Sequence, residues 1–336
     1  MGRISRRLAA SLLCIAVVLP LSASSAAAIT DQERAAAGIG YLRTVQEADG
    51  SIPAFSPIGS TADAVLAVYA AGVGKGVRTK AIRYLAGEVE AGNVGTIGLQ
   101  AKVALAASAA GIDPRDFGGK NLINPIRAAI GDDGHIGDTA VFDQALAVLA
   151  LETVGVPRVS TTTWLLDAQC PDGGWAYDAP YASGTDDDHC DGDGGSDTDF
   201  FTSDTNTTAY VIQALEYINR DDYTVDPFTY LNDVRDPDRG GWGYSAGFGT
   251  DANSTALVLQ AYAADEQALP AGSRKALRKL QYASCGAWAF TRTAGGKGDP
   301  DVGATIGAIP GVRTTPLPIP LAPPTALAAT PKTPAC

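Results

Sequence analysis

An alanine-rich apolar sequence, called a phrase below, occurs six times along this 336-residue chain, and the helical pattern stops at the end of each copy. Two copies read VLAVYAAG and VALAASAAG. Each phrase is entered through a short segment whose middle residue is Thr or Gln: Thr61, Gln100, Gln144, Thr208, Thr255 and Thr305. Repetition at about 40 to 50 residues, with one longer step, indicates a repeat architecture in which neighbouring units bury a shared core.

The six phrases are apolar on nearly every side, which places their helices inside the fold, covered on both faces. More amphipathic segments between them predict an outer layer of helices at 32–46, 77–89, 122–130, 160–169 and 273–280. Two helices in each of six repeats predict about twelve helices in a closed double ring. The predicted fold class is all-α, an α/α toroid or (α/α)6 barrel of about six helix-pair repeats, and an irregular helical domain is the alternative.

A second motif recurs where outer helices should end in a glycine turn. Its complete copies are 46–52 (QEADGSI) and 169–175 (QCPDGGW), and degraded copies end in Trp242 and Trp288. The motif resembles the QW repeat of the terpenoid cyclase and protein prenyltransferase α/α-toroid superfamily, of the squalene cyclase-like kind, over roughly residues 32–312. The resemblance implies that each Gln caps a helix end and that each aromatic ring stacks at a joint between repeats. The second and third repeats lack both residues.

The resemblance also implies where a cyclase would carry its catalytic acid. Class II cyclases of the superfamily place it in the sequence D-x-D-D-T-A at the start of an inner helix. Here the matching segment is 204–209, and Asn206, which cannot donate a proton, stands at the acid position. Asn253 and Gly303 occupy the same place in the next two repeats. We therefore expect no cyclisation initiated by protonation.

Protein prenyltransferases of the superfamily need a zinc site of Asp, Cys and His. This chain has two histidines, His135 and His189. The sequence DHC around His189 lies outside the inner helix starts, and no second histidine is placed to complete a site. The resemblance therefore implies no zinc and leaves open whether the protein is an enzyme.

The inner helices of such a ring run parallel, so their N-termini gather at one rim, where a ligand would bind. The candidate ligand-binding residues at these starts are Asp204, Asn206, Asp251, Asn253 and Asp301. Helix capping is the alternative, because Asp and Asn side chains accept hydrogen bonds from the first backbone N–H groups. A glycosidase pair is a further alternative, for which carboxylates at the rim would come from Asp138, Asp143, Asp204 and Asp251.

Residues 181–204 form an insertion with eight aspartates and no Lys or Arg. Calcium prefers six to eight oxygen ligands, so we consider calcium as a cofactor, with Asp191, Asp193, Asp197 and Asp199 as its candidate ligands. A solvated loop is the alternative. Cys170 and Cys190 are the favoured disulfide pair, because a bond between them would close the base of the insertion and stabilise the fold by roughly 3 kcal/mol.

The first 28 residues read as a secretory signal, with three arginines before an apolar run and a small-residue cleavage site at 26–28. The net charge is −12 for the chain. This charge argues against nucleic acid or an anionic membrane as a partner, and no later apolar run reaches the roughly 20 residues that span a bilayer. Residues 313–336 hold seven prolines and read as an extended or disordered Pro-rich tail.

Together these features predict a secreted, extracellular α/α toroid at 29–312. The leading functional prediction is a non-catalytic binding or interaction protein for a small hydrophobic or glycan ligand. The alternative is an enzyme of the terpenoid cyclase-like or glycan-active type that uses carboxylates at the rim.

Overall fold

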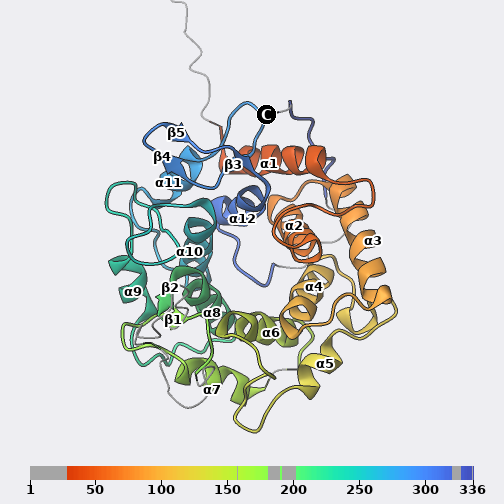
Figure 1. Cartoon of the computed structure of the whole chain (residues 1–336), viewed down its shortest axis with the longest axis vertical. Coiled ribbons are helices and arrows are strands. Elements are labelled where there is room, and N and C mark those ends of the chain that lie inside the picture. The colour runs from red at the N-terminus through yellow and green to blue at the C-terminus, as the bar shows by residue number, and fades with distance from the viewer. Residues whose placement is uncertain (1–28, 157, 181–189, 191–201, 320–326, 335) are drawn as a thin grey trace, which may run out of the picture.

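The computed structural model describes residues 29–156, 158–180, 190, 202–319, 327–334 and 336. In this part of the chain, twelve α-helices form a closed double ring (Figure 1). The inner helices are α2 (Pro57–Ala71), α4 (Ile97–Ala109), α6 (Val141–Thr153), α8 (Thr205–Tyr217), α10 (Ala252–Ala264) and α12 (Val302–Arg313). The outer helices are α1 (Asp31–Val45), α3 (Lys75–Ala91), α5 (Ile123–Ala128), α7 (Val159–Asp167), α9 (Pro227–Asp233) and α11 (Ser273–Lys279). This is the α/α toroid that the repeats predict.

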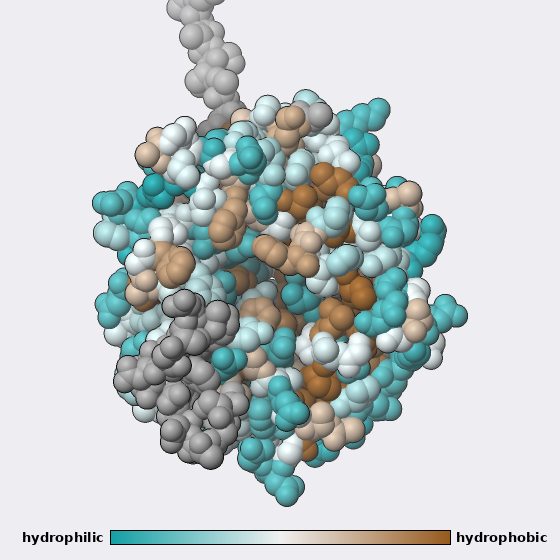
Figure 2. Space-filling view, viewed as in Figure 1, coloured by the Kyte–Doolittle hydropathy of each residue, from teal (hydrophilic) through white to brown (hydrophobic). Residues whose placement is uncertain are grey.

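The ring closes between its first and last repeats. The inner helices α12 and α2 pack together, and in the outer layer Arg278 of α11 forms an ion pair with Asp31 of α1. Small side chains allow the inner helices to approach closely: a Cβ atom on Gly311 of α12 would lie 2.4 Å from the Cβ of Ala256 of α10. The space-filling view shows apolar residues gathered inside a polar periphery (Figure 2).

Short strands connect the end of an outer helix with the start of the next inner helix. β1 (Trp175–Ala176) pairs with β2 (Ser203–Asp204), and β3 (Trp288–Ala289) pairs with β6 (Pro300–Asp301). A hairpin of β4 (Arg292–Thr293) and β5 (Gly296–Lys297) lies between the second pair, and a 3₁₀ turn, η1 (Pro114–Asp116), precedes α5. In both ladders the motif tryptophan is the register partner of an aspartate at the start of an inner helix.

The three motif tryptophans are joints between repeats. Their rings are fully buried, and each indole N–H donates to a carbonyl of the preceding outer helix: Trp175 to Leu165, Trp242 to Leu231 and Trp288 to Leu277. Each backbone N–H donates to the hydroxyl of the next inner helix's middle residue, Thr208, Thr255 or Thr305. The recurring threonine of the inner phrases is therefore part of the joint.

The motif glutamines join successive outer helices. The Gln169 amide donates to the carbonyls of Gly173, at 3.0 Å, and Val225, at 2.7 Å. Gln46 donates in the same way to Gly50 and Val77. Each glutamine therefore satisfies carbonyl groups of the glycine turn and of the segment that begins the next outer helix.

Two repeats without the motif glutamine keep these bonds through other residues. Arg235 donates to the carbonyls of Gly240 and Ala271, the counterparts of Gly173 and Val225. In the third repeat the side chain of Gln144, on an inner helix, donates to Gly134 and Thr161. The hydrogen bonds between repeats are therefore more regular than the sequence motif.

The described part of residues 313–336 forms no helix or strand after Arg313, and it packs against the ring. Arg313 is still helical, and the chain after it turns into the ring, where Leu317 and Ile319 are buried. Further on, the Ala328 carbonyl accepts the N–H of Gly74 at 3.0 Å. Leu317, Ile319 and Leu327 explain this packing, because their apolar side chains are buried against the ring.

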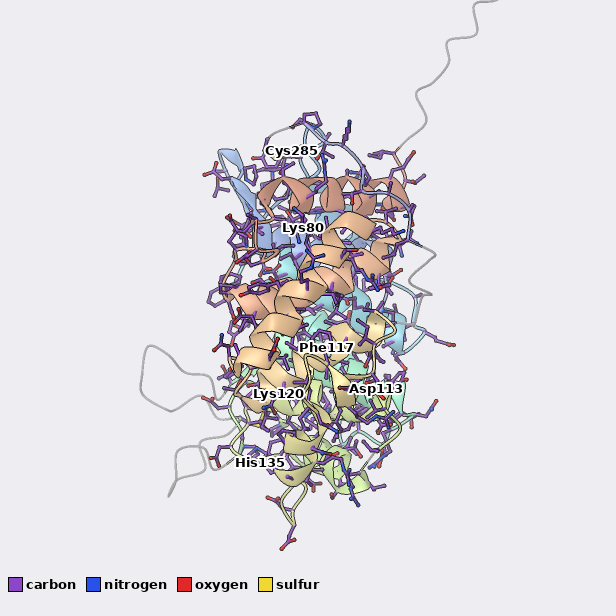
Figure 3. The ribbon with its side chains drawn as sticks, turned by 90° about the vertical axis from the view of Figure 1, so that its right-hand side faces the viewer. Lys80, Asp113, Phe117, Lys120, His135 and Cys285 are labelled. Atoms are coloured by element: carbon purple, nitrogen blue, oxygen red, sulfur yellow. A yellow bond between two sulfur atoms is a disulfide. The ribbon has the colours of Figure 1, made fainter. Side chains whose placement is uncertain are left out.

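Two disulfides are present in the described residues. One joins Cys170 to Cys190, the pair favoured from the sequence, with Cα atoms 5.3 Å apart. The other joins Cys285 to Cys336 and fastens the end of the tail to the outer layer; Figure 3 labels Cys285 at the top of the molecule. Disulfides are typical of exported proteins.

Several sequence predictions fall outside the described residues. Residues 1–28, read as a signal, are among them, and so are the calcium candidates Asp191, Asp193, Asp197 and Asp199. In the part of the chain that the structure covers, no cluster of three or more His, Cys, Asp or Glu side chains could hold a metal ion. No described helix combines the length and apolar character that a bilayer crossing needs.

Candidate functional site

A cavity of about 440 Å³ lies in the middle of the ring. Most of its wall is apolar, with side chains that include Phe55, Leu66, Phe142, Leu257, Phe290, Ile306, Leu317 and Ile319. Its polar members are Ser60, Asp63, Lys102, Asn206, Tyr210, Tyr244, Asp251, Asn253, Ser254 and Gln260. An apolar cavity with a few placed polar groups is the usual form of a site for a small molecule.

The repeat explains which residues face this cavity. Positions two before and two after the middle Thr or Gln lie four residues apart, on one face of a helix. On α8 these positions are Asn206 and Tyr210, and on α10 they are Asn253 and Leu257. The class II acid position thus lies on the cavity wall in this chain, occupied by an amide.

A half-buried ion pair forms one side of the wall. Lys102 of α4 lies 3.0 Å from Asp63 of α2, and the two side chains are 19% and 32% exposed. Burial lowers the pKa of Lys102, but Asp63, together with Tyr210 and Asp143, outweighs this effect, so that the pKa rises above its ordinary value. Burial also raises the pKa of the neighbouring Tyr210 to about 12. Lys102 therefore stays protonated and is not a base.

Asp204 serves as the N-cap of α8. Its Oδ1 accepts the N–H groups of Asn206, at 2.9 Å, and Thr207, at 2.8 Å. The residue is 2% exposed, and burial raises its pKa to about 6 against the opposing effect of these hydrogen bonds. The structure thus places Asp204 inside the joint, and it is not among the residues that line the cavity.

Asp251 and Asp301 are N-caps as well. Asp251 accepts the N–H and the hydroxyl of Ser254, both at 2.8 Å, and burial raises its pKa to about 6. Asp301 accepts the N–H of Ala304 at 2.6 Å. The capping alternative therefore describes all three aspartates, and of the three only Asp251 also lines the central cavity.

Asn206 and Asn253 differ from these caps, because both residues line the central cavity. They occupy equivalent positions on the adjacent helices α8 and α10. Among the described residues neither side-chain oxygen has a hydrogen-bond partner. A buried amide oxygen without a partner costs free energy, so these two positions are not optimised for stability alone.

The sequence did not single out Asp63, Lys102 or Tyr210. All three lie two residues after a middle Thr or Gln, the position that faces the cavity. The repeat does mark these positions, but they could be recognised as cavity residues only by knowing which face of each inner helix turns inward.

A second cavity, of about 1000 Å³, lies where α6 begins and α7 ends. Its wall holds the carboxylates of five aspartates: Asp133, Asp138, Asp143, Asp167 and Asp178. His135, labelled near the lower end of Figure 3, stacks on Trp164 with ring centres 4.3 Å apart and planes 4° apart. Burial raises the pKa of Asp143, and Lys102 opposes this. Of the four carboxylates considered for a glycosidase, Asp138 and Asp143 line this cavity, Asp251 lines the central cavity, and Asp204 lies in a joint between repeats.

The fold and the cavity define the class as an α/α toroid. No protein-family model and no curated protein matches the sequence. Among solved structures, the chain is similar to an inactive variant of an α-1,6-mannanase of Salegentibacter sp. HEL1_6 in complex with α-1,6-mannotriose, at 14% identity and a TM-score of 0.54, over 84% of this chain and 98% of that chain.

Two further solved structures show the same likeness. The type II terpene cyclase MstE from Scytonema, as a variant in complex with geranylgeranyl dihydroxybenzoate, has 12% identity and a TM-score of 0.53, over 84% of this chain and 96% of that one. A glycosidase variant in complex with glucose has 13% identity and a TM-score of 0.54, over 84% and 96%. At such identities the likeness establishes the toroid fold alone.

Proposed function

We propose that this chain is a secreted, non-catalytic binding protein that holds a small, largely apolar and uncharged molecule in its ring. The observation that carries the proposal is the pair of amide side chains of Asn206 and Asn253, which occupy equivalent positions on the adjacent helices α8 and α10. Both lie on the wall of the 440 Å³ cavity. A ligand hydroxyl would form hydrogen bonds with these amide side chains, and the apolar wall would bury the rest of the molecule.

The charges around the cavity favour an uncharged ligand. Its wall holds two carboxylates, Asp63 and Asp251, and one ammonium, Lys102, which is already paired with Asp63. A carboxylate or phosphate headgroup would find no unpaired cation there and would meet the field of Asp251. This arrangement supports alcohols over fatty acids and prenyl diphosphates.

The chemistry of the rim supports binding over catalysis. The residue at the cyclase acid position is Asn206, and the aspartates beside it accept backbone N–H groups as caps. Lys102 is paired with Asp63, and its raised pKa keeps it protonated at neutral pH.

The proposal is tested with N-phenyl-1-naphthylamine, an uncharged apolar probe whose fluorescence rises in an apolar site. We expect saturable binding to the wild-type protein, and competition by 1-decanol but not by decanoate. Leu257→Trp fills the cavity and should weaken probe binding at least tenfold, whereas Leu257→Met conserves the side-chain volume and should bind as the wild type does. Absence of saturable binding to the wild type, or equal binding to the Trp variant, overturns the proposal.

A second candidate function follows from the acidic cavity between α6 and α7. Glycan-active enzymes need two carboxyl groups, one with a raised pKa, and Asp143 has a pKa raised by burial. The stacked rings of His135 and Trp164 would offer a flat face to a sugar. Hydrolysis of α-1,6-mannotriose by the wild type but not by Asp143→Asn would support this candidate, and no hydrolysis would dismiss it for this substrate.

A further inference from the structure

We propose that residues 315–319 form a septum across the bore of the ring and set the length of the ligand that the central cavity accepts. This inference rests on the proposed function and identifies the segment that limits the length of the ligand. It assigns the C-terminal segment a role in specificity.

The septum lies deep inside the ring. After α12 the chain turns toward the ring axis, as the dark blue segment in Figure 1 shows. The backbone N–H of Leu317 donates to Oε1 of Gln213 at 2.9 Å, and Gln213 lies seven residues, or about two helical turns, beyond Asn206 on α8. Leu317 and Ile319 are 7% and 5% exposed. The segment therefore lies well below the two asparagines.

A separate cavity of about 570 Å³ lies on the other side of this segment. Its wall includes Asp113, Thr153 and Tyr217, near the C-terminal ends of inner helices, together with Pro318 and Ile319. Ile319 also lines the central cavity. In Figure 3, His135 is labelled at the face where the inner helices begin, and Asp113 is labelled toward the opposite face. One side chain, Ile319, is thus shared by two cavities that open toward opposite faces.

The septum is held by its own contacts. It continues directly from α12, whose last turn is packed inside the ring. The bond from the Leu317 N–H to Gln213 and the burial of Leu317 and Ile319 hold it across the bore. These contacts make the septum a floor.

The mouth of the central cavity lies opposite this floor. Phe55 and Phe290 line the cavity and are 88% and 43% exposed. An apolar chain whose hydroxyl binds Asn206 and Asn253 would extend inward until it meets Leu317 and Ile319. Each added methylene buried above the floor should tighten binding about fourfold, and methylenes beyond that length should add nothing.

The test measures how straight-chain primary alcohols from 1-octanol to 1-hexadecanol displace N-phenyl-1-naphthylamine. For the wild type we expect affinity to rise with chain length and then to level off at a defined length. Ile319→Gly opens the wall between the two cavities, so the rise should continue for at least two further methylenes. Leu327→Gly is the matched control: it removes a buried tail side chain outside both cavities, and the length limit should stay that of the wild type.

The outcomes separate the two proposals. A limit that moves in Ile319→Gly and not in Leu327→Gly supports the septum. The same limit in all three proteins, with binding intact, overturns the septum and leaves the proposed function standing. No displacement by any alcohol from the wild type overturns the proposed function, and the septum role with it. Melting temperatures of the variants show that each is folded at the assay temperature.

Discussion

The hydroxyl of Thr255 accepts the backbone N–H of Trp242 at 2.9 Å and donates to the carbonyl of the same residue at 3.1 Å. This pair connects the turn after an outer helix with the first turn of an inner helix. Because both residues are fully buried, no water can replace the bond. The contact also explains why a Thr recurs at the middle position of the inner phrases.

Thr255→Val should therefore destabilise the protein through two lost hydrogen bonds at nearly constant volume. We expect a loss of about 1–3 kcal/mol in the free energy of unfolding, because the Trp242 N–H stays buried without an acceptor. Urea unfolding measures this loss. The matched control is Thr229→Val on the surface of α9, where we expect a change within about 0.5 kcal/mol. Equal effects of the two substitutions would contradict the role of Thr255.

Much of the fold could be predicted from the sequence, because helix and repeat signals are local. The apolar phrases identified the inner helices, and the amphipathic segments identified most of the outer ones. The use of Arg235 in place of a motif glutamine could not be predicted, since its partners, Gly240 and Ala271, are backbone carbonyls brought together only by the ring. The proline content of the tail favoured an extended or disordered segment, although apolar residues between the prolines, such as Leu317 and Ile319, are buried in the bore.

The candidate site was predicted in part. The rim positions Asn206, Asp251 and Asn253 do line the central cavity, because the family motif marks the start of inner helices. Whether they bind a ligand is still a prediction. Asp204 and Asp301 act as caps, and a carboxylate that caps a helix has the same sequence pattern as one that faces a cavity. Three-dimensional contacts were needed to distinguish them.

The stability of the protein should depend on pH through Asp251. Burial raises its folded pKa from 3.8 to about 6, so the folded state binds a proton more tightly than the unfolded state between these values. The contribution of Asp251 is therefore most favourable below about pH 4 and is lost as the pH rises through 6. The free energy of unfolding of the wild type, relative to Asp251→Asn, should fall by at most about 3 kcal/mol across this window.

Urea unfolding at half-unit steps from pH 4 to 7 measures this difference. Asp113 provides a control of opposite sign, since its hydrogen bonds with Arg115 lower its pKa. The stability of the wild type relative to Asp113→Asn should rise with pH at the acidic end. A flat Asp251 difference would show that the carboxyl is not held in its raised-pKa state.

The acidic insertion leads to a calcium prediction. If Asp191, Asp193, Asp197 and Asp199 bind calcium, added calcium should raise the melting temperature, because a ligand that binds only the folded state stabilises it. Calorimetry in calcium and in equal magnesium measures the effect. Replacing all four aspartates with Asn should remove the calcium response. An unchanged melting curve of the wild type at millimolar calcium would leave the solvated-loop interpretation.

The unmodified protein should not cyclise squalene or linear prenyl substrates. The side chain at the acid position, Asn206, lines the cavity but carries no acidic proton. Product analysis by mass spectrometry tests this directly, and any cyclic product from the wild type contradicts the assignment.

The double variant Asn206→Asp with Thr207→Asp tests whether the loss of the acid is local. It rebuilds the D-x-D-D-T-A sequence on α8, and the new carboxyl at 206 would lie on the cavity wall, close to Asp204 along the chain. Burial and a neighbouring carboxylate both raise a carboxyl pKa, so any cyclising activity should be highest at acidic pH and fall as that group ionises. The matched control, Asn206→Leu with Thr207→Asp, has no acid at the cavity wall and should form no product. Product from the double variant alone would identify the ring as a former cyclase site, whereas product from the control as well would exclude residue 206 as the proton donor.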